Sequence, residues 1–389
     1  MATENNNKTL NVPNLRFPEF SGEWEQYRLG NLVEIRSGVS PTGVIDGEGV
    51  FPFYKVEQLN NCYIYLGTTP YMTNQSVIPA NSIVFPKRGA AIMTNKIRIS
   101  SKPCQIDTNL MALSIISSKE FDYKFIYYFI DLYNLSKIAD TSTIPQINNI
   151  HINPLKIKIP SICEQKKISD FLSLLDDRIA TQIKIIEKLE SLIRGISNNL
   201  LYSESGTPVR LGDILSERSE RTKVNNQHEV LSSTVKGIFS QREYFSKDIA
   251  SENNVGYKVI RLYDVVLSPQ NLWMGNINYN DKFDIGIVSP SYKIFSIADG
   301  YDKRFVAAML KTHRALYNYM LVSEQGASVV RRNLNMEAFE QLVFKMPPID
   351  KQREIGNAIS ALQSRLELAV RVKTGYEKQK QWLLTEMFI

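Results

Sequence analysis

The segment from Ser161 to about Tyr202 carries the longest periodic run of apolar residues in the sequence, and this run constrains the fold more than any other feature. Its positions advance by alternating steps of four and three residues, which is the spacing of a coiled-coil seam. Ser161 and Glu164 match a capping box that would begin the helix. The predicted seam residues are Ile168, Leu172, Leu175, Ile179, Ile186, Leu189, Ile193, Ile196 and Leu200.

The same register returns near the C-terminus, which makes the long helix one half of an internal repeat. The offset between the two runs is constant, because 355 minus 168 and 387 minus 200 both equal 187. The second predicted seam consists of Ile355, Ile359, Leu362, Leu366, Ala369, Tyr376, Leu383 and Met387. Neither helix can bury its seam alone, so we expect the two to pair in antiparallel orientation. Lys373 and Lys380 interrupt the second seam, and we expect the pairing there to be imperfect or open to another protein.

Each predicted helix follows a globular segment in which strand-like and helix-like runs alternate. Strand-like runs occupy residues 82–86 and 106–115 in the first segment, and 264–269 and 289–297 in the second. Helix-like runs follow at 123–139 and 303–321, and closing strand-like runs at 152–159 and 339–346. Both segments open with Arg-Leu-Gly, at Arg28 and Arg210, so the repeat includes the globular parts.

The sequence therefore predicts an α+β fold with an internal pseudo-two-fold repeat. Two mixed α/β domains are separated by two long helices, which pair as an antiparallel coiled coil. At about 1.5 Å per residue, a helix of about 40 residues is a rod of roughly 60 Å, long enough to act as a spacer. The predicted boundaries are 1–14 for a flexible Asn-rich N-terminus, 15–160 and 204–347 for the domains, and 161–203 and 348–389 for the helices.

Composition restricts the class of protein only weakly. The 389 residues carry a formal net charge of +6 with an isoelectric point near 8.9, which permits nucleic-acid binding without establishing it. Three cysteines and three histidines at wide spacing argue against a disulfide framework and a zinc site, so no metal is expected. The polar start resembles no signal peptide, and no apolar run reaches the about 18 residues of a membrane span. We therefore expect a cytoplasmic protein.

Motifs of common enzyme classes are missing from the sequence. It contains no GxxxxGK[ST] phosphate loop and no HExxH zinc motif. Asn153-Pro154-Leu155 lacks the second proline and the aromatic residue that an amino-methyltransferase would have. We therefore expect no catalytic residue and no cofactor in this chain.

Two proline-to-helix entries carry a resemblance to a known family, namely KIPSICEQKKI at 158–168 and KMPPIDKQREI at 345–355. Together with the opening from Trp24 to Gly30, they resemble the specificity subunits of type I restriction-modification systems, over almost the whole chain. The resemblance implies two target recognition domains that read a bipartite site on double-stranded DNA through the major groove. It also implies that the helix pair sets the gap between the half-sites.

The resemblance implies partners and a division of labour as well. Two modification subunits would carry S-adenosylmethionine and methylate adenine N6 on each strand. Two restriction subunits, which use ATP and Mg²⁺, would cleave DNA whose site is unmethylated. This chain would recognise the DNA without catalysis, as part of phage defence.

Side chains that suit bases or phosphates single out several segments of the two domains. Lys87 and Arg88 follow a predicted strand, and Lys96 and Arg98 alternate so that both would lie on one strand face. The full set of candidate DNA-binding residues is Lys87, Arg88, Lys96, Arg98, Gln241, Arg242, Gln270, Asn271, Asn276, Arg331, Arg332 and Asn333. Solvated turns and ordinary strand faces remain open as alternatives for these residues. Trp273 would be a wedge between bases or, more in keeping with its type, a packed aromatic.

Two other functions remain open at this point. A coiled-coil adaptor whose domains bind proteins would show affinity for a protein partner with no dependence on DNA. A self-contained enzyme that fuses recognition with catalysis is disfavoured by the chain length and by the missing motifs.

Overall fold

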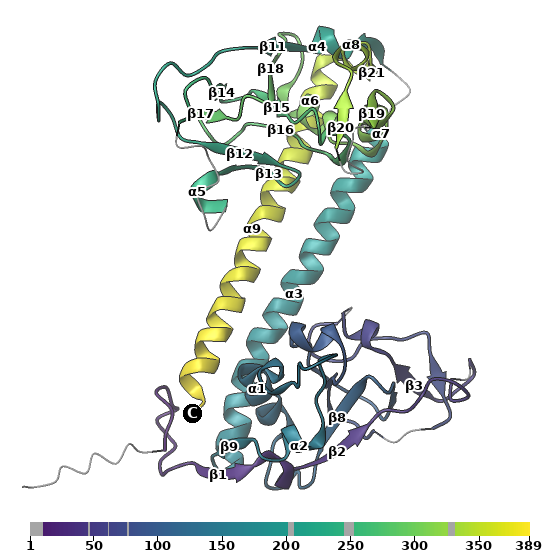
Figure 1. The fold of residues 1–389 in the computed structure, drawn as a ribbon, viewed down its shortest axis with the longest axis vertical. Helices are drawn as coiled ribbons and strands as arrows, with labels where there is room; N and C mark the ends of the chain where they lie inside the picture. The colour runs from purple at the N-terminus through teal and green to yellow at the C-terminus, as the bar shows by residue number, and fades with distance from the viewer. Residues whose placement is uncertain are drawn as a thin grey trace, which may run out of the picture. The chain divides into compact units, whose positions relative to one another are not determined.

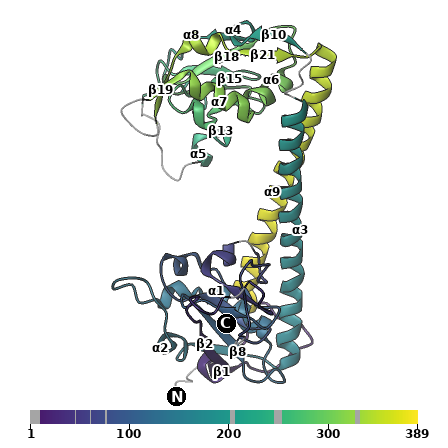
Figure 2. The ribbon, with the colours of Figure 1, turned by 90° about the vertical axis from the view of Figure 1, so that its right-hand side faces the viewer.

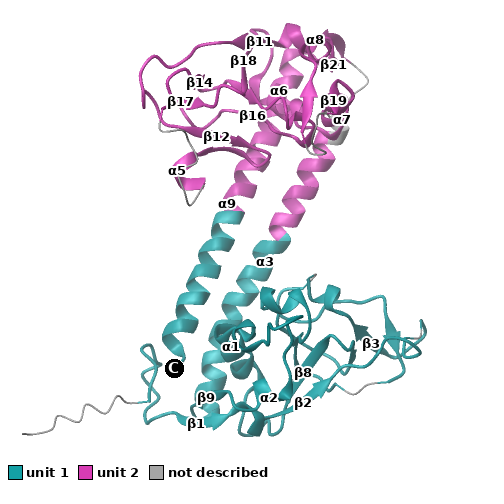
Figure 3. Ribbon diagram, viewed as in Figure 1, with its two compact units in different colours: residues 1–184, 370–389 teal, residues 185–369 magenta. Residues whose placement is uncertain are grey.

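The computed structural model describes residues 11–45, 47–60, 62–75, 78–200, 206–244, 253–325 and 331–389. The chain forms two compact units, of which unit 1 comprises residues 1–184 and 370–389 and unit 2 comprises residues 185–369. Two long helices, α3 (Ile162–Leu200) and α9 (Ile349–Met387), each contribute one half to each unit (Figure 3). The helices match the predicted ranges, whereas most of the predicted flexible N-terminus lies outside the described residues.

Unit 1 is built on a four-stranded antiparallel sheet with the order β2-β8-β5-β6. These strands are Val33–Ser37, Leu110–Ile115, Ile83–Pro86 and Arg98–Ile99. A three-stranded sheet of β4 (Met72–Thr73), β3 (Phe51–Tyr54) and β7 (Gln105–Ile106) adjoins it, with β3 and β7 parallel. The alternation of apolar residues in β8 and β5 produces two cores, one on each face of the main sheet, since side chains alternate along a strand.

The helices of unit 1 close the larger of its two cores. Helix α1 (Tyr123–Tyr133) lies beside the first half of α3 (Figures 1 and 2). The chain then passes through the short α2 (Asn149–Ile152) to β9 (Lys156–Ile159), which pairs antiparallel with β1 (Glu25–Arg28). The core also takes in the end of α9, because Leu383 and Phe388 are buried and the Phe388 ring stacks on Phe125 with centroids 4.8 Å apart.

Unit 2 has a four-stranded antiparallel sheet with the corresponding order β11-β18-β15-β16. These strands are Leu215–Arg218, Lys293–Ile297, Val265–Leu267 and Ile277–Tyr279. Three further antiparallel strand pairs belong to unit 2. Strand β12 (Leu231–Thr234) pairs with β13 (Gly237–Ser240), and β14 (Lys258–Arg261) pairs with β17 (Ile285–Val288). Strand β19 (Ser323–Gln325) pairs with β20 (Arg332–Leu334). The opening strand β10 (Thr207–Arg210) pairs with the closing strand β21 (Val343–Met346), as β1 does with β9.

Unit 2 carries five α-helices besides its parts of α3 and α9 among the residues described. They are α4 (Leu211–Ile214), α5 (Gln241–Tyr244), α6 (Lys303–Leu310), α7 (His313–Leu321) and α8 (Met336–Glu340). Its main core joins α6, α7 and α8 to the four-stranded sheet and to Ile355 and Ile359 of α9. Each unit therefore packs residues of both long helices against its core, and in unit 2 the residue from α3 is Ile196.

Several predicted elements are interrupted in the structure. The run 123–139 ends as an α-helix at Tyr133, because Asn134 adopts a positive φ of 62° that stops the helix. The run 303–321 divides into α6 and α7, since Thr312 accepts a hydrogen bond from the backbone N–H of Ala315 and starts a new helix. The run 106–115 divides into β7 and β8 around a turn at Asp107. The prediction that Lys96 and Arg98 share a strand is wrong, because β6 begins only at Arg98.

The two long helices enter their units through the same side-chain contact. Gln165 accepts a hydrogen bond from the backbone N–H of Asp122, the N-cap of α1, at 2.9 Å and donates to the carbonyl of Pro160 at 2.9 Å. Gln352 accepts from Asp302, the N-cap of α6, at 3.0 Å and donates to the carbonyl of Pro347 at 2.8 Å. The glutamine of each proline-to-helix entry thus ties a long helix to the first turn of a domain helix.

The start of α3 differs from the predicted capping box. Ser161 accepts from the backbone N–H of Glu164 at 3.4 Å, as expected. The Glu164 carboxylate instead receives the Arg16 guanidinium through two hydrogen bonds of 2.7 Å and the Trp24 indole N–H at 3.3 Å. The glutamate therefore fixes the N-terminal segment to the helix rather than capping it.

The predicted seam positions of α3 and α9 are buried or half-buried wherever their side chains are described. Those that pack into the two main cores include Ile168, Leu172, Leu175, Ile355, Ile359, Leu383 and Met387. The side chain of Leu200 lies outside the described residues. The burial follows the heptad pattern within each unit, and pairing as a coiled coil stays a prediction.

The sequence predicted imperfect helix pairing at Lys380, but the structure of unit 1 gives this side chain polar partners. Its side chain is buried, and its Nζ lies 2.9 Å from the buried carboxylate of Asp176 on α3 and 3.5 Å from that of Asp131 on α1. The Tyr128 hydroxyl donates to the other Asp176 oxygen at 2.5 Å. The ring of Tyr63 also faces the ammonium group, at 5.7 Å from its centroid. A polar cluster thus occupies this seam position and joins α9 to α3 and α1.

A membrane-spanning helix is absent from the described part of the chain, where no helix is long and apolar enough.

Candidate nucleic-acid interface

In unit 1 the loop that follows the central strand β5 presents two cations beside a second segment. Arg88 is exposed and forms a β-bridge with Gln146. The backbone N–H of Gly89 donates to the carbonyl of Pro145, and that of Ile147 donates to the carbonyl of Lys87, both at 2.8 Å. The positive φ of Gly89, 85°, turns the chain sharply here, and a residue without Cβ adopts it at no steric cost. The loop is therefore held rigidly.

The two cations of this loop have different surroundings. Lys87 is half-buried, and desolvation lowers the pKa of its ammonium group, while the negative charge of Asp107 partly opposes that shift. Arg88 is exposed, and its guanidinium offers several N–H donors in a planar fork. Arg88 is therefore the better placed of the two to meet a phosphate or a guanine edge.

In unit 2 the structure brings together two segments that are far apart in the sequence. The loop after β15 contains Gln270, whose carbonyl accepts from the backbone N–H of Arg332 at 3.1 Å. The Arg332 guanidinium lies over the Trp273 ring, 5.0 Å from its centroid, and donates to the carbonyl of Met320 at 3.4 Å. Trp273 is thus a half-buried platform for an arginine, while Gln270 and Arg331 are exposed.

The loop after the central strand thus meets the segment before the closing strand in both units. The contact joins 87–89 to 145–147 in unit 1 and Gln270 to Arg332 in unit 2. The exposed cation is on the first segment in unit 1, at Arg88, and on the second in unit 2, at Arg331. Sequence reasoning could not see that the two segments touch, because backbone hydrogen bonds join them.

Asn276 occupies the interior of unit 2, with 6% of its surface exposed. Its Oδ1 accepts from the Ser233 hydroxyl at 2.9 Å, and its Nδ2 donates to the Ser233 carbonyl at 3.1 Å. Both ends of the amide thus hold β12 to the start of β16. We therefore leave Asn276 out of the residues proposed to contact DNA.

Asn271 follows Gln270 in the loop after β15, and Asn333 follows Arg332 in β20. The other four candidate residues make their contacts elsewhere. Lys96 donates to the side-chain carbonyl of Asn60, and half-buried Arg98 donates to the carbonyl of Ile97 at 2.7 Å. Gln241 and Arg242 begin α5, where Arg242 is exposed and the Gln241 backbone N–H donates to Val230 at 3.0 Å. The structure does not bring either pair to the segments described above by any hydrogen bond among the described residues.

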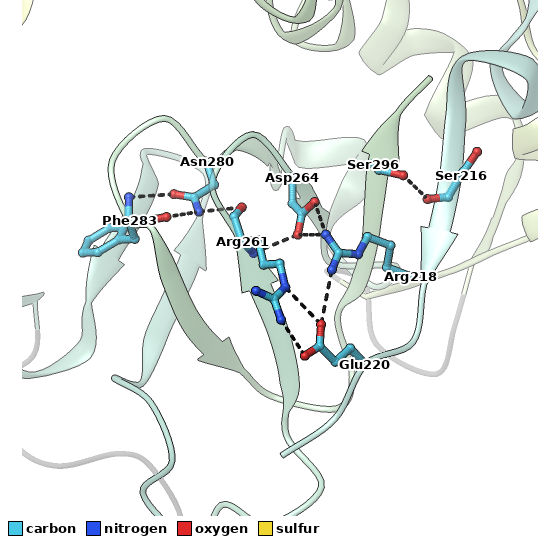
Figure 4. A network of polar contacts seen from close by, with 8 residues as sticks. All are labelled: Ser216, Arg218, Glu220, Arg261, Asp264, Asn280, Phe283 and Ser296. Carbon is cyan, nitrogen blue, oxygen red and sulfur yellow. Dashed lines mark hydrogen bonds and ion pairs between the residues drawn. The ribbon is translucent and has the colours of Figure 1, made fainter. Parts of the chain in front are cut away.

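Two arginines of unit 2 are engaged in an internal ion-pair network (Figure 4). Arg218 contacts Asp264 at 3.0 Å and Glu220 at 3.2 Å, and Arg261 contacts Glu220 at 2.8 Å. Burial raises the pKa of Asp264, although the backbone N–H of Arg261 and the Arg218 guanidinium counter the shift. The pKa of Glu220 is lowered, chiefly by its hydrogen bond from Arg261. Both guanidinium groups thus have carboxylate partners within the fold.

Metal ligation has no support in the described part of the chain, which contains no cluster of three or more His, Cys, Asp or Glu side chains suited to an ion. The cysteines Cys62, Cys104 and Cys163 are free thiols. The geometry of the two paired segments supplies anchored loops with exposed cations and amides.

Comparison with known proteins shows what the chain is similar to. Residues 21–191 match the model of the type I restriction modification DNA specificity domain. The chain is 22% identical to the type I restriction enzyme MjaVIII specificity subunit of Methanocaldococcus jannaschii, over 95% of this chain and 92% of the relative. It is 21% identical to the putative MjaX specificity subunit of the same organism, over 97% and 95%.

A solved structure shares the fold over nearly the full length. The type I restriction-modification system S subunit from M. genitalium superposes with a TM-score of 0.65 at 16% identity, covering 97% of this chain and 99% of the other. The mixed helix and sheet architecture with long helices is thus that of an S subunit. Residues 21–191 of the chain thus match a type I restriction modification DNA specificity domain, and the chain is similar over nearly its whole length to specificity subunits of type I restriction enzymes.

Proposed function

We propose that this chain is the DNA-recognition subunit of a type I restriction-modification complex and has no catalytic activity of its own. Each unit reads one half of a bipartite target in the major groove, where the base edges are distinguishable. Its work on host DNA would place it in the cytoplasm. The observation that carries the proposal is the repeated junction in which the loop after the central strand meets the segment before the closing strand.

The repeated architecture supports a two-part target. The sheets follow corresponding strand orders, and Gln165 and Gln352 make equivalent bonds to the helices of their units. A chain that repeats its recognition unit would meet two DNA segments in the same way, as two-module DNA readers do. The exposed Arg88 and Arg331 suit phosphates or guanine edges at each half-site.

The long helices would set the gap between the half-sites. Burial along α3 and α9 follows the predicted heptads within each unit, and we propose that the two helices pair as an antiparallel coiled coil. We further propose that the internal repeat extends over domains and helices, related by an approximate two-fold axis. The length of the pair would then fix how many bases remain unread.

Catalysis would reside in partner subunits. Two modification subunits would bind S-adenosylmethionine and methylate adenine N6 within the two half-sites. Two restriction subunits would use ATP and Mg²⁺ to cleave DNA when neither strand is methylated. This chain would direct both activities by placing the complex on its target.

Binding measurements with the chain and its modification subunit test the proposal. We expect salt-sensitive binding to a specific bipartite duplex, because neutralised phosphates release counterions. Arg88→Ala and Arg331→Ala should each weaken binding and reduce the salt slope by about one. Arg261→Ala is the matched control, since its guanidinium is already paired with Glu220 and the salt slope should not change. Equal affinity for all duplexes would contradict the proposal.

A further inference from the structure

Residues 140–146 of unit 1 form a small hairpin that projects polar side chains. Asp140 and Gln146 exchange both backbone hydrogen bonds at 2.9 Å, and the Asp140 carboxylate accepts from the backbone N–H of Ser142 at 2.9 Å. All four tip residues, Thr141 to Ile144, are exposed, and Ile144 exposes 53% of its surface. A closed hairpin thus displays three hydroxyl groups and one branched apolar side chain.

The base of the hairpin is joined to the loop of Lys87 and Arg88. Gly89 donates to the carbonyl of Pro145 at 2.8 Å, and Arg88 is bridged to Gln146. The next residue, Ile147, is fully buried in the main core and donates to the carbonyl of Lys87. The hairpin and the cationic loop are therefore joined by backbone contacts beside the buried Ile147.

The hairpin has the dimensions and chemistry of a major-groove reader. The groove is about 12 Å wide and admits a two-stranded ribbon, whose strands lie about 4.8 Å apart. Hydroxyl groups pair with several base edges, and an apolar side chain contacts the methyl group of thymine. The Asp140 carboxylate is held by the turn, and its pKa is lowered chiefly by the N–H of Ser142. No cation lies on the tip, so phosphate contact falls to the neighbouring loop.

Unit 2 has a hairpin at the same place in its chain order. Strands β19 and β20 lie between helix α7 and the short α8, as residues 140–146 lie between α1 and α2. The unit 2 hairpin is also bonded to the loop after the central strand, through Arg332 and Gln270. Asn148 and Asn335 stand at the N-caps of the short helices that follow. The strand pair of unit 2 thus occupies the place in the chain order that residues 140–146 occupy in unit 1.

We propose that hairpin 140–146 reads bases of the half-site recognised by unit 1, while Lys87 and Arg88 hold the flanking phosphates. A rigid frame with exchangeable tip residues is what a reader of variable sequences needs, since phosphate contacts position and base contacts specify. This inference rests on the proposed function. It adds Thr141, Ser142, Thr143 and Ile144, which sequence reasoning did not single out because they are neither cations nor amides.

Methylation of a DNA library with a randomised half-site tests the inference, using the chain in complex with its modification subunit. Ile144→Ala and Thr143→Ala should each change the preferred base at one or two positions of one half-site by about tenfold, and leave the other half-site unchanged. Arg88→Ala should weaken methylation of all sequences alike, without changing a preferred base.

Ile150→Ala is the matched control, because Ile150 lies on α2, outside the hairpin, with 73% of its surface exposed. The complex with this variant should have the same base preferences as the complex with the unaltered chain. Tip variants that keep the unaltered preferences at both half-sites would overturn the role of the hairpin while leaving the proposed function intact. Failure of the unaltered complex to methylate any bipartite sequence would instead overturn the proposed function.

Discussion

Gln165 shows how a single side chain anchors a long helix to its unit. Its amide makes three hydrogen bonds, to the N–H of Asp122 and to the carbonyls of Pro160 and Glu120, within 3.0 Å. The side chain is 1% exposed, so water cannot replace these partners. The same amide at Gln352 makes two of the three contacts in unit 2, which explains why glutamine occurs at this position of both copies.

Gln165→Leu should lower the free energy of unfolding of unit 1 by about 1–3 kcal/mol, because it leaves buried polar groups without partners. Urea denaturation followed by tryptophan fluorescence measures the change, since Trp24 is buried in this unit. Gln379→Leu is the control, as Gln379 is exposed on α9 and should change stability by less than about 0.5 kcal/mol. Equal effects of the two variants would contradict the anchoring role.

Lys380→Met should destabilise unit 1 by about 3–5 kcal/mol near neutral pH, because it leaves the Asp176 carboxylate buried without its cation. Burial already raises the pKa of Asp176, and Lys380 opposes that shift, so its removal raises the pKa further. A raised folded-state pKa of a carboxyl group gives stability at low pH that is lost as pH rises. The deficit of the variant should therefore shrink from pH 8 toward pH 5.

Urea denaturation across this pH range checks the result for Lys380→Met. The control is the double variant Lys380→Met with Asp176→Asn, which has no buried charge at this site and keeps an acceptor for Tyr128. The free energy of unfolding of this double variant, relative to that of the unaltered chain, should change little between pH 8 and pH 5, because residue 176 can no longer titrate. A deficit of Lys380→Met that grows on acidification would contradict the assignment.

The end of α9 acts as a structural element of unit 1. Leu383, Leu384, Met387 and Phe388 are buried in the core that also holds Trp24 and Phe125. The backbone carbonyl of Glu386 accepts from the N–H of Leu15 at 2.8 Å. The end of α9 thus completes the core of unit 1.

Phe388→Ala should cost about 3–5 kcal/mol of stability in unit 1, because the ring is 6% exposed and stacks on Phe125. Ile389→Ala, at the next residue, should cost less than about 0.5 kcal/mol, since Ile389 is 43% exposed. Hydrogen exchange of the strand and helix amides of unit 1 would show the difference. Equal protection in both variants would mean that the helix end is not part of the core.

The long elements followed from the sequence, whereas the short ones depended on tertiary contacts. The heptads predicted α3 and α9 to within a few residues, since periodicity over many turns is a strong signal. The break at Thr312 was missed because a cap inside an apolar run has little signal of its own. Lys380 was interpreted as a seam defect, since its partners on α3 and α1 are far away in sequence.

The candidate site was predictable only in part, for the same reason. The loop of Lys87 and Arg88 was found from its charge and its position after a strand. Its neighbour at 140–146 was missed, because its base is held by backbone bonds that no residue type reveals. Asn276 was included for its amide, although that amide is used inside the fold.

At the scale of the whole molecule, the proposed spacer role of α3 and α9 predicts that longer helices give a longer gap between the two DNA half-sites. Insertions of four residues between Lys184 and Ile185 and between Ala369 and Val370 lie at the borders of the two units and disturb neither core. Each adds one helical turn of about 6 Å, which corresponds to about one or two base pairs of B-DNA. We expect methylated sites with both half-sites unchanged and a longer gap. A changed half-site with the original gap would contradict the spacer role.

The central claim is that this chain directs adenine methylation to a bipartite sequence. A genome-wide map of N6-methyladenine in host cells, with and without this gene, tests it most directly. The account predicts that loss of the gene removes methylation from one split motif, on both strands, and that restoring the gene restores it. Identical methylation maps, in cells whose modification subunit is shown to be active with another specificity subunit, would contradict the account.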